Sequence, residues 1–457
     1  MTIAKFSDDI QSYKVKLSSG AEVRYVNMDN AATTPPFQCV QEAVTTYMHA
    51  YGSVHRGTGS KSQVSTDLYE ASRDTIRKFV NAPDDSYVLY TANTTGAMNT
   101  AAYFFSFFEG KVAVSDIEHS ASWLPWIKAE GVRCLGNDRF ELEDAEQINR
   151  MVQKEGTEQV VRYRVNDAFE FDIDEIESIL KTNKIKVFVL TASSNATGYC
   201  PDVKAIGELV HKYGALYIVD GCQFIQHHKI DMQEMNIDFL AASGHKFYAP
   251  YGGGFLIGPK TFFDGCLPYE IGGGNLPYID MNGEFYRTKT QLAHDPGTPN
   301  AVGAVAMAAA IDEISRLGID RIEAYEYGLA KQMFDALQDN PRIKLFVSNV
   351  HLCTILPFNI DGVSPDNVAR RLNDDFGIGV RYGSFCVYDF VRRLLDISDD
   401  SEIIRKVNAG EGNAVPGFVR ASVSLSTSQN DVDRFISAIN QICDETATGD
   451  QVVQAAE

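Results

Sequence analysis

Two apolar runs joined by a helical segment constrain the fold of this chain more than any other feature. Residues 187–190 and 216–219 are uninterrupted apolar runs of aliphatic and aromatic residues, as in strands buried on both faces of a sheet. Between them, apolar residues recur at helical spacing over 203–213, and Gly214 follows where a helix would end. Parallel strands connected by a helix predict an α/β fold.

A charged residue follows each of the second and third apolar runs. Asp220 comes directly after 216–219, and the run at 239–242 leads to Lys246. In open α/β sheets, ligand-binding groups gather at the carboxyl ends of the strands. Pyridoxal 5'-phosphate requires such a pair, because the lysine forms a Schiff base and the aspartate keeps the pyridine nitrogen protonated. Singly, each is more often a surface lysine or a turn cap, but together, with glycines 252–254 behind them, they favour a cofactor site.

The composition narrows the class of protein. A chain of 457 residues can bury a large core and form two domains. Its net charge of -20 disfavours nucleic acid and anionic membranes as partners, because both are polyanions. No secretory signal is visible at the start, and no apolar run approaches the ~20 residues of a membrane span. The eight cysteines form no C-x-x-C pairs, which predicts neither a disulfide framework nor a metal site and indicates the reducing cytoplasm.

The segments VDGCQ (219–223), SGHKFY (243–248) and YGGG (251–254) occur in the order typical of one family. They resemble the core of the class V aminotransferases, and most of all the branch of cysteine desulfurases and selenocysteine lyases. The resemblance extends over most of the chain. It implies the fold type I of pyridoxal phosphate enzymes, an α/β fold with a mostly parallel seven-stranded sheet. The expected domains are a large one at 30–305 and a smaller α+β domain made of 1–29 and 306–457.

Hydroxyl side chains begin the helix that follows the strand at 87–91. Backbone N–H groups and the helix dipole favour a phosphate dianion at such an N-terminus. The resemblance assigns Thr94 and Thr95 to the phosphate-binding turn. It adds Ser243 and His245 from the lysine segment. Thr298, in the loop DPGTPN (295–300), is the residue that relatives present to the cofactor phosphate of the partner subunit.

Three further residues are expected at the cofactor ring. His119 lies in EHSAS (118–122), where relatives stack a histidine on the pyridine ring; otherwise it is a hydrogen-bonded core residue. Asn195 matches the family asparagine that donates to the phenolic oxygen, although a turn-forming asparagine is the simpler interpretation. Gln223 resembles the family residue near the same oxygen.

Three arginines are candidates for substrate binding. Arg420 lies in GFVRAS (417–422), which resembles the segment whose arginine grips the substrate α-carboxylate in bidentate fashion. A structural salt bridge is the alternative role. Arg56, in SVHRG (53–57), matches a loop that reaches the neighbouring subunit in relatives, which implies a homodimer with shared active sites. Arg381 precedes the candidate nucleophile.

Cys386 ends the segment VRYGSFC (380–386), where desulfurases carry their nucleophilic cysteine. Relatives often have two histidines before it, whereas this chain has Ser384 and Phe385. A cysteine beside a phenylalanine is often buried and inert, and only a thiolate would attack. Compared with the family, the chain is longer at 387–416 and at 135–162, the second of which is expected to be a surface excursion.

These residues predict a reaction. An amino acid displaces Lys246, which then removes the Cα proton while Asp220 keeps the ring an electron sink. With L-cysteine, Cys386 attacks the substrate sulfur, which leaves a persulfide on the enzyme and releases alanine; a sulfur-acceptor protein is then an expected partner. A C–S β-lyase would not need Cys386, and a transaminase or epimerase would need a keto acid or reprotonation at Cα. An inactive scaffold is disfavoured because Lys246 and Asp220 are both present.

Overall fold

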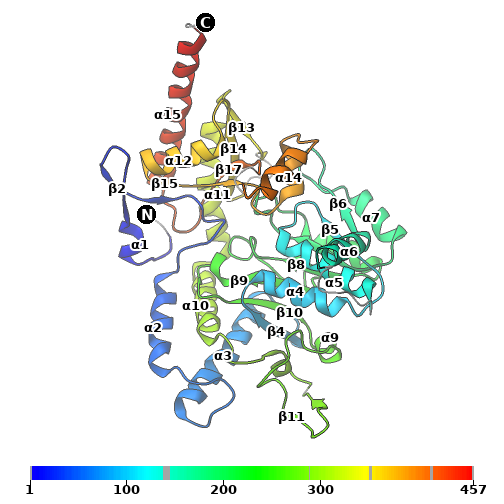
Figure 1. The fold of residues 1–457 in the computed structure, drawn as a ribbon. Coiled ribbons are helices and arrows are strands. Elements are labelled where there is room, and N and C mark those ends of the chain that lie inside the picture. Colours follow the sequence, from blue (N-terminus) through cyan, green and yellow to red (C-terminus); the bar gives the residue numbers. More distant parts are fainter. Residues whose placement is uncertain (1–2, 137–144, 288, 349–352, 412–414, 455–457) are drawn as a thin grey trace. The chain divides into compact units, whose positions relative to one another are not determined.

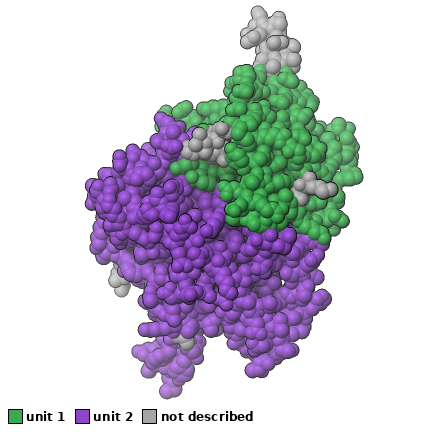
Figure 2. Space-filling view, turned by 180° about the vertical axis from the view of Figure 1, so that it is seen from behind, with its two compact units in different colours: residues 1–35, 194–200, 317–457 green, residues 36–193, 201–316 purple. Residues whose placement is uncertain are grey.

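The computed structural model describes residues 3–136, 145–287, 289–348, 353–411 and 415–454 (Figure 1). The chain divides into two compact units (Figure 2). Unit 1 contains Met1–Pro35, Ser194–Cys200 and Leu317–Glu457, and unit 2 contains Pro36–Ser193 and Pro201–Arg316. The domains expected from the sequence, 30–305 and 1–29 with 306–457, stay a prediction beside these two units, of which the smaller also includes Ser194–Cys200.

Unit 2 is built on a seven-stranded sheet with the order β4-β10-β9-β8-β7-β5-β6. Strand β10 runs antiparallel to both of its neighbours, and the other pairs are parallel. This sheet confirms the expected α/β fold. Its strands are β4 (Ser86–Thr91), β5 (Lys111–Ser115), β6 (Val160–Tyr163), β7 (Ile185–Thr191), β8 (Leu216–Asp220), β9 (Phe239–Ser243) and β10 (Gly254–Pro259).

The register of the central strands decides which polar residues meet at the edge of the sheet. Every residue of β7 is buried, as its apolar sequence predicts. Thr191 at the end of β7 is paired with Asp220 at the end of β8, and Asp220 in turn is paired with Ala241 of β9. The carboxyl ends of three buried strands therefore lie side by side, with Ser243 at the end of the third and Lys246 shortly after it.

Helices with one apolar face pack around this sheet. In α8 (Val203–Lys212), Asp202 caps the first turn by accepting from Ala205 N at 3.0 Å, and Val203, Ile206 and Val210 are buried. The other helices of unit 2 are α2 (Gln38–Ala50), α3 (Ser60–Phe79), α4 (Thr94–Phe105), α5 (Ser120–Leu135), α6 (Ala145–Glu158), α7 (Ile173–Thr182), α9 (Lys260–Gly265), α10 (Ala301–Leu317) and the short 3-10 helices η2 (Gly244–Lys246) and η3 (Gln291–His294). A small hairpin of β11 (Tyr278–Ile279) and β12 (Phe285–Tyr286) completes the unit.

The segment expected to be a surface excursion contributes to the sheet instead. Residues 137–144 lie outside the described part, but the end of this segment forms the edge strand β6, parallel to β5. Helix α6 packs on α5 so closely that neither Gly131 nor Gly156 has room for a Cβ atom. Gly156 of α6 is buried against α5, while Glu146, Arg150, Lys154 and Glu158 of the same helix are exposed.

Unit 1 contains a four-stranded sheet, β13-β14-β17-β16, in which every described pair is antiparallel. The N-terminal arm joins this unit: β3 pairs with β15, and Ser422 N donates to Met28 O at 2.7 Å. Its strands are β1 (Lys14–Lys16), β2 (Glu22–Arg24), β3 (Val26–Asn27), β13 (Ile343–Leu345), β14 (Ile355–Ile360), β15 (Ile378–Gly379), β16 (Arg381–Gly383) and β17 (Phe418–Ser422). Its helices are α1 (Asp8–Ser12), α11 (Ile319–Leu337), α12 (Pro365–Phe376), α13 (Tyr388–Leu394), α14 (Ser401–Asn408) and α15 (Gln429–Gln454).

The other segment in which the chain is longer than the family, 387–416, forms α13 and α14. Residues 412–414 lie outside the described part. None of the residues of α14 is buried. Within the described ranges, no helix is both long enough and apolar enough to cross a membrane.

Candidate active site

Lys246 lies in the tight turn that follows β9. Gly244 N donates to Gly253 O at 2.8 Å, and a side chain at Gly244 would collide with Met307 and Ala249 O. The turn therefore requires glycine before the lysine. Lys246 Nζ donates to Gln223 Oε1 at 3.0 Å, so the structure brings together two of the predicted cofactor residues.

Asp220 is buried and held at both carboxylate oxygens. Its Oδ1 accepts from Cys222 N at 2.9 Å, and its Oδ2 accepts from Ser122 Oγ. Each oxygen has a second lone pair, so the carboxylate can accept a further N–H donor. The sequence analysis did not identify Ser122. The only signal for it was its position in the first turn of α5, just after His119.

His119 is the N-cap of α5. Its Nδ1 accepts from Ala121 N at 3.1 Å. In the neutral ring the proton therefore lies on Nε2, because Nδ1 is occupied as an acceptor. The ring is half-buried.

Glu118, next to His119, is a buried carboxyl whose importance the sequence analysis missed. Its Oε1 accepts from Ser115 Oγ at 2.8 Å and from Thr191 N at 2.6 Å. The pKa of Glu118 is raised to about 8, mainly because the group is buried and also because Asp220 places a negative charge nearby. The group therefore holds its proton at neutral pH and adds no second negative charge beside Asp220.

The start of α4 has the features of an anion-binding turn. Asn93 caps the helix by accepting from Gly96 N at 3.0 Å, so the expected phosphate-binding residues Thr94 and Thr95 occupy its first turn. Gly254 of β10 pairs with Thr91 on one side and Ser243 on the other. A Cβ atom on Gly254 would lie 2.6 Å from Asn93 Cα.

Two hydroxyl groups are buried in this turn region. The oxygens of Thr94 and Ser243 are buried and without a hydrogen-bond partner among the described residues. Burial, and next the charge of Lys246, lower the pKa of His245 to about 4, so this ring is neutral at pH 7. Unsatisfied buried hydroxyls at a helix N-terminus are what a phosphate group would satisfy.

Arg56 and Thr298 belong to a group of loops elsewhere in unit 2. Arg56 Nη2 donates to Gly297 O and, at 3.5 Å, to Gly273 O. The motif segments at 53–57 and 295–300 thus meet around one guanidinium, together with the glycines at 272–274. Thr298 is exposed in this group.

A buried ion pair anchors these loops, and the sequence analysis did not identify it. Arg73 of α3 pairs with Asp295, and both side chains are at most 5% exposed. Arg73 also donates to Val88 O, and His55 Nε2 lies 2.9 Å from Glu70 Oε1. The ligand atoms of His55, Glu70 and Asp295 lie within 4.8 Å of one another, and the Arg73 guanidinium pairs with both carboxylates.

In unit 1, Arg420 of β17 is fully buried and already paired. Its Nη2 lies 3.0 Å from Asp29 Oδ1, its Nη1 donates to Asn195 O at 2.7 Å, and its guanidinium stacks 4.5 Å from the Phe385 ring centre. Burial lowers the pKa of Arg420 to about 10, against the opposing effect of Asp29. The structural salt bridge considered as the alternative is therefore present, and a role in carboxylate binding stays a prediction.

Asn195 and Cys386 are linked through the backbone of Phe385. Asn195 Nδ2 donates to Phe385 O at 2.8 Å. Phe385 and Cys386 have φ of +51° and +61°, a left-handed conformation that is costly for two consecutive residues with side chains. The Cys386 thiol is half-buried. The pKa of Tyr388 is raised, mainly by burial and to a smaller extent by the Cys386 thiol. Arg381 is exposed on β16 and pairs in register with Arg420.

Similar proteins are found along almost the whole chain. The family model described as aminotransferase class-V matches residues 26–149 and 142–435. A probable cysteine desulfurase of Halalkalibacterium halodurans is 32% identical over 377 residues, which are 81% of this chain and 86% of the relative. The cysteine desulfurase CsdA of Escherichia coli is 28% identical, with 91% of this chain and 93% of CsdA covered.

Two solved structures have the same fold. The crystal structure of E. coli CsdA in its S-sulfonic acid form has a TM-score of 0.73 at 27% identity, and covers 91% of this chain and 94% of its own. The apo structure of a cysteine desulfurase from Thermococcus onnurineus NA1 has a TM-score of 0.76 at 26% identity, with 97% and 100% covered. The likeness therefore includes both units.

Proposed function

The chain belongs to the class-V aminotransferase family, and from this premise we propose that it is a pyridoxal phosphate-dependent cysteine desulfurase. It would convert L-cysteine to alanine and leave the sulfur as a persulfide on Cys386. The observation that carries the choice of reaction is Cys386 itself: a half-buried thiol held on a strained turn, at the end of a segment that resembles the nucleophile segment of desulfurases. A lyase would have no use for this thiol.

The family depends on pyridoxal phosphate, and the residues present fit that group. The unsatisfied hydroxyls of Thr94 and Ser243 support a phosphate site at the start of α4, with Thr95 and His245 as further donors. Lys246 would hold the cofactor covalently and Asp220 its ring nitrogen. Ring contacts are proposed for His119, Asn195 and Gln223, and a phosphate contact for Thr298. When bound, the cofactor withdraws the electrons released at Cα.

The residues of unit 2 are arranged for proton transfer. Lys246 Nζ is proposed to take the Cα proton, and its hydrogen bond to Gln223 Oε1 at 3.0 Å fixes the position of the amino group. Ser122 and the Cys222 N–H fix the orientation of the Asp220 carboxylate. His119 can donate from Nε2, because Nδ1 is occupied by Ala121 N.

The residues of unit 1 are assigned to the substrate carboxylate and sulfur. Arg420, supported by Arg381, is the proposed carboxylate ligand, as the family motif implies. Arg56 belongs to unit 2 and is proposed to contact substrate in the neighbouring subunit of the dimer. The Cys386 thiolate forms an S–S bond to the substrate sulfur while the C–S bond of the substrate breaks. The carbon then takes a proton, so that L-cysteine and the enzyme thiol become alanine and the enzyme persulfide.

The persulfide must leave the enzyme, and we propose a thiol of an acceptor protein as its destination. We also propose a homodimer with shared active sites. The hairpin of β11 and β12 supports this, because its large apolar side chains are exposed without cover in one chain. These are Tyr278, Ile279, Met281, Phe285 and Tyr286. A cytoplasmic location is proposed on the ground that all eight cysteines are free thiols.

Product analysis tests the proposed reaction. Purified protein loaded with pyridoxal phosphate is incubated with L-cysteine and a reductant, and alanine, pyruvate and sulfide are measured. Equal amounts of alanine and sulfide are expected. Pyruvate with sulfide would instead identify a C–S β-lyase, and neither product would mean that L-cysteine is not the substrate.

A further inference from the structure

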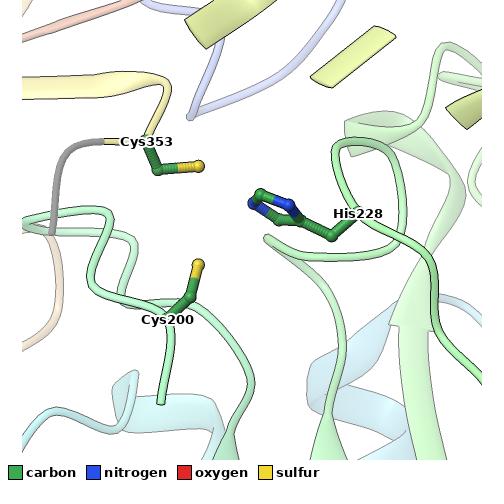
Figure 3. Close-up of side chains that lie close together, drawn as sticks. All are labelled: Cys200, His228 and Cys353. Atoms are coloured by element: carbon green, nitrogen blue, oxygen red, sulfur yellow. The ribbon is translucent and has the colours of Figure 1, made fainter. Parts of the chain in front are cut away.

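Two cysteines of unit 1 that are far apart in the sequence lie next to each other. Cys200 and Cys353 have their Sγ atoms within 4.8 Å of each other. Figure 3 shows both sulfur atoms turned toward the same space; it also draws His228, a residue of unit 2. Cys353 is buried and Cys200 half-buried. Nothing in the cysteine spacing of the sequence indicates this pair.

The backbone is built to bring the two residues together. The turn before Cys200 is closed by hydrogen bonds from Gly198 N to Ser194 O at 2.7 Å and from Ser194 N to Tyr199 O at 2.9 Å. Gly198 has a φ of +77°, and a Cβ atom on it would lie only 3.5 Å from Cys353 Cβ. A glycine with left-handed φ thus lets the turn lie directly against the residues that lead into β14.

We propose that Cys200 and Cys353 form a dithiol site that a low-molecular-weight disulfide oxidises to an intramolecular disulfide. One thiolate attacks the disulfide of the oxidant, which forms a mixed disulfide and releases one thiolate of the oxidant. The second cysteine thiolate then attacks the protein sulfur of the mixed disulfide and releases the other half of the oxidant as a thiolate. The two protein thiols lose two electrons, and the oxidant gains them.

The geometry suits this second step. The S–S bond needs a separation of about 2.0 Å, so the sulfurs, which lie within 4.8 Å of each other, must approach by less than ~3 Å. Cys134 provides a contrast within the same chain. It is exposed, so it should react with the oxidant at least as fast and, having no part in this pair, remain a mixed disulfide.

Oxidation would also act on the proposed active-site residues, and this consequence rests on the proposed function. The turn that ends at Cys200 carries Asn195, whose side chain binds Phe385 O and whose carbonyl accepts from Arg420. Pulling Cys200 toward Cys353 displaces this turn. The expected result is a loss of desulfurase turnover that a dithiol reductant reverses.

The test is peptide mapping of the full chain. Cofactor-loaded protein is treated with oxidised glutathione, alkylated, and digested without reductant. A cross-linked peptide containing Cys200 and Cys353 is expected, while Cys134 carries glutathione. In Cys200→Ser the cross-link disappears, while Cys134 still carries glutathione.

Two results would overturn the proposal. In the first, Cys200 and Cys353 are recovered alkylated, or only as separate mixed disulfides, under conditions that fully modify Cys134. In the second, the purified protein contains stoichiometric zinc that is lost in Cys200→Ser, which would make the pair a metal site. Because the peptide map needs no turnover, it stays decisive even if L-cysteine is not the substrate.

Discussion

Replacing Asp295 by asparagine should destabilise unit 2 strongly, because it leaves the Arg73 guanidinium buried without its main counter-charge. The two side chains are 3% and 5% exposed. Removing one partner of a buried ion pair costs ~3–5 kcal/mol. Arg73 keeps Glu70 Oε1 at 3.4 Å, but Glu70 is 37% exposed and its charge is partly screened by water. We therefore expect the lower end of that range, about 3 kcal/mol.

The assay is equilibrium or thermal unfolding of Asp295→Asn beside the wild type. In a unit of this size each kcal/mol shifts Tm by roughly 2 °C, so a fall of about 6 °C is expected. Asp84→Asn is the matched control: it removes the same charge from the surface pair Arg77–Asp84, in which Asp84 is fully exposed, and should change Tm very little.

A double variant separates the lost ion pair from other effects. Adding Arg73→Met to Asp295→Asn removes the stranded charge, so the pair of substitutions should destabilise the protein less than the sum of the single ones. If Asp295→Asn unfolded with the midpoint of the wild type, or if the effects were simply additive, the ion pair would not hold this part of the structure together.

Three further changes test single residues of the candidate site. Lys246→Ala should purify without covalently bound cofactor and without its yellow colour, and borohydride trapping on a different lysine would contradict the assignment. Asp220→Ala should keep the cofactor but lose nearly all turnover in the alanine assay; near-normal activity would make Asp220 a turn cap. The pKa of Glu118 is about 8 in the folded protein and 4.5 in the unfolded chain. The free energy of unfolding of the wild type should therefore decrease as the pH is raised from 4.5 to 8. Glu118→Gln should lack that fall in denaturation curves, and equal pH dependence of both proteins would refute the buried acid.

The parts of the fold that the sequence predicted are those set by local pattern. The apolar runs of β7, β8 and β9 are buried strands with helix α8 between the first two, because an uninterrupted apolar run has few other places to go. Once these strands are in register, the residues at their carboxyl ends are neighbours. The positions of Asp220 and Lys246 at adjacent strand ends followed from that.

The contacts that the sequence did not predict are those between distant segments. Ser122 and Asp220 are 98 positions apart, and nothing in either local pattern requires their hydrogen bond. The same holds for Arg73 with Asp295 and for Cys200 with Cys353, since the strands and turns that bring them together are assembled from separate parts of the chain. The contact of α6 with α5 also joins separate segments, since only Gly156 on an otherwise polar helix marks the packed face.

The most direct test of the proposed function is to locate the sulfur after a single turnover. Cofactor-loaded protein is mixed with L-cysteine, thiols and persulfides are alkylated, and the digest is mapped. A persulfide on Cys386 in an amount equal to the alanine released is predicted, and Cys386→Ser should keep its cofactor and release no alanine. If the Cys386→Ser protein released alanine at the wild-type rate, or the persulfide lay on another cysteine, Cys386 would not be the sulfur carrier.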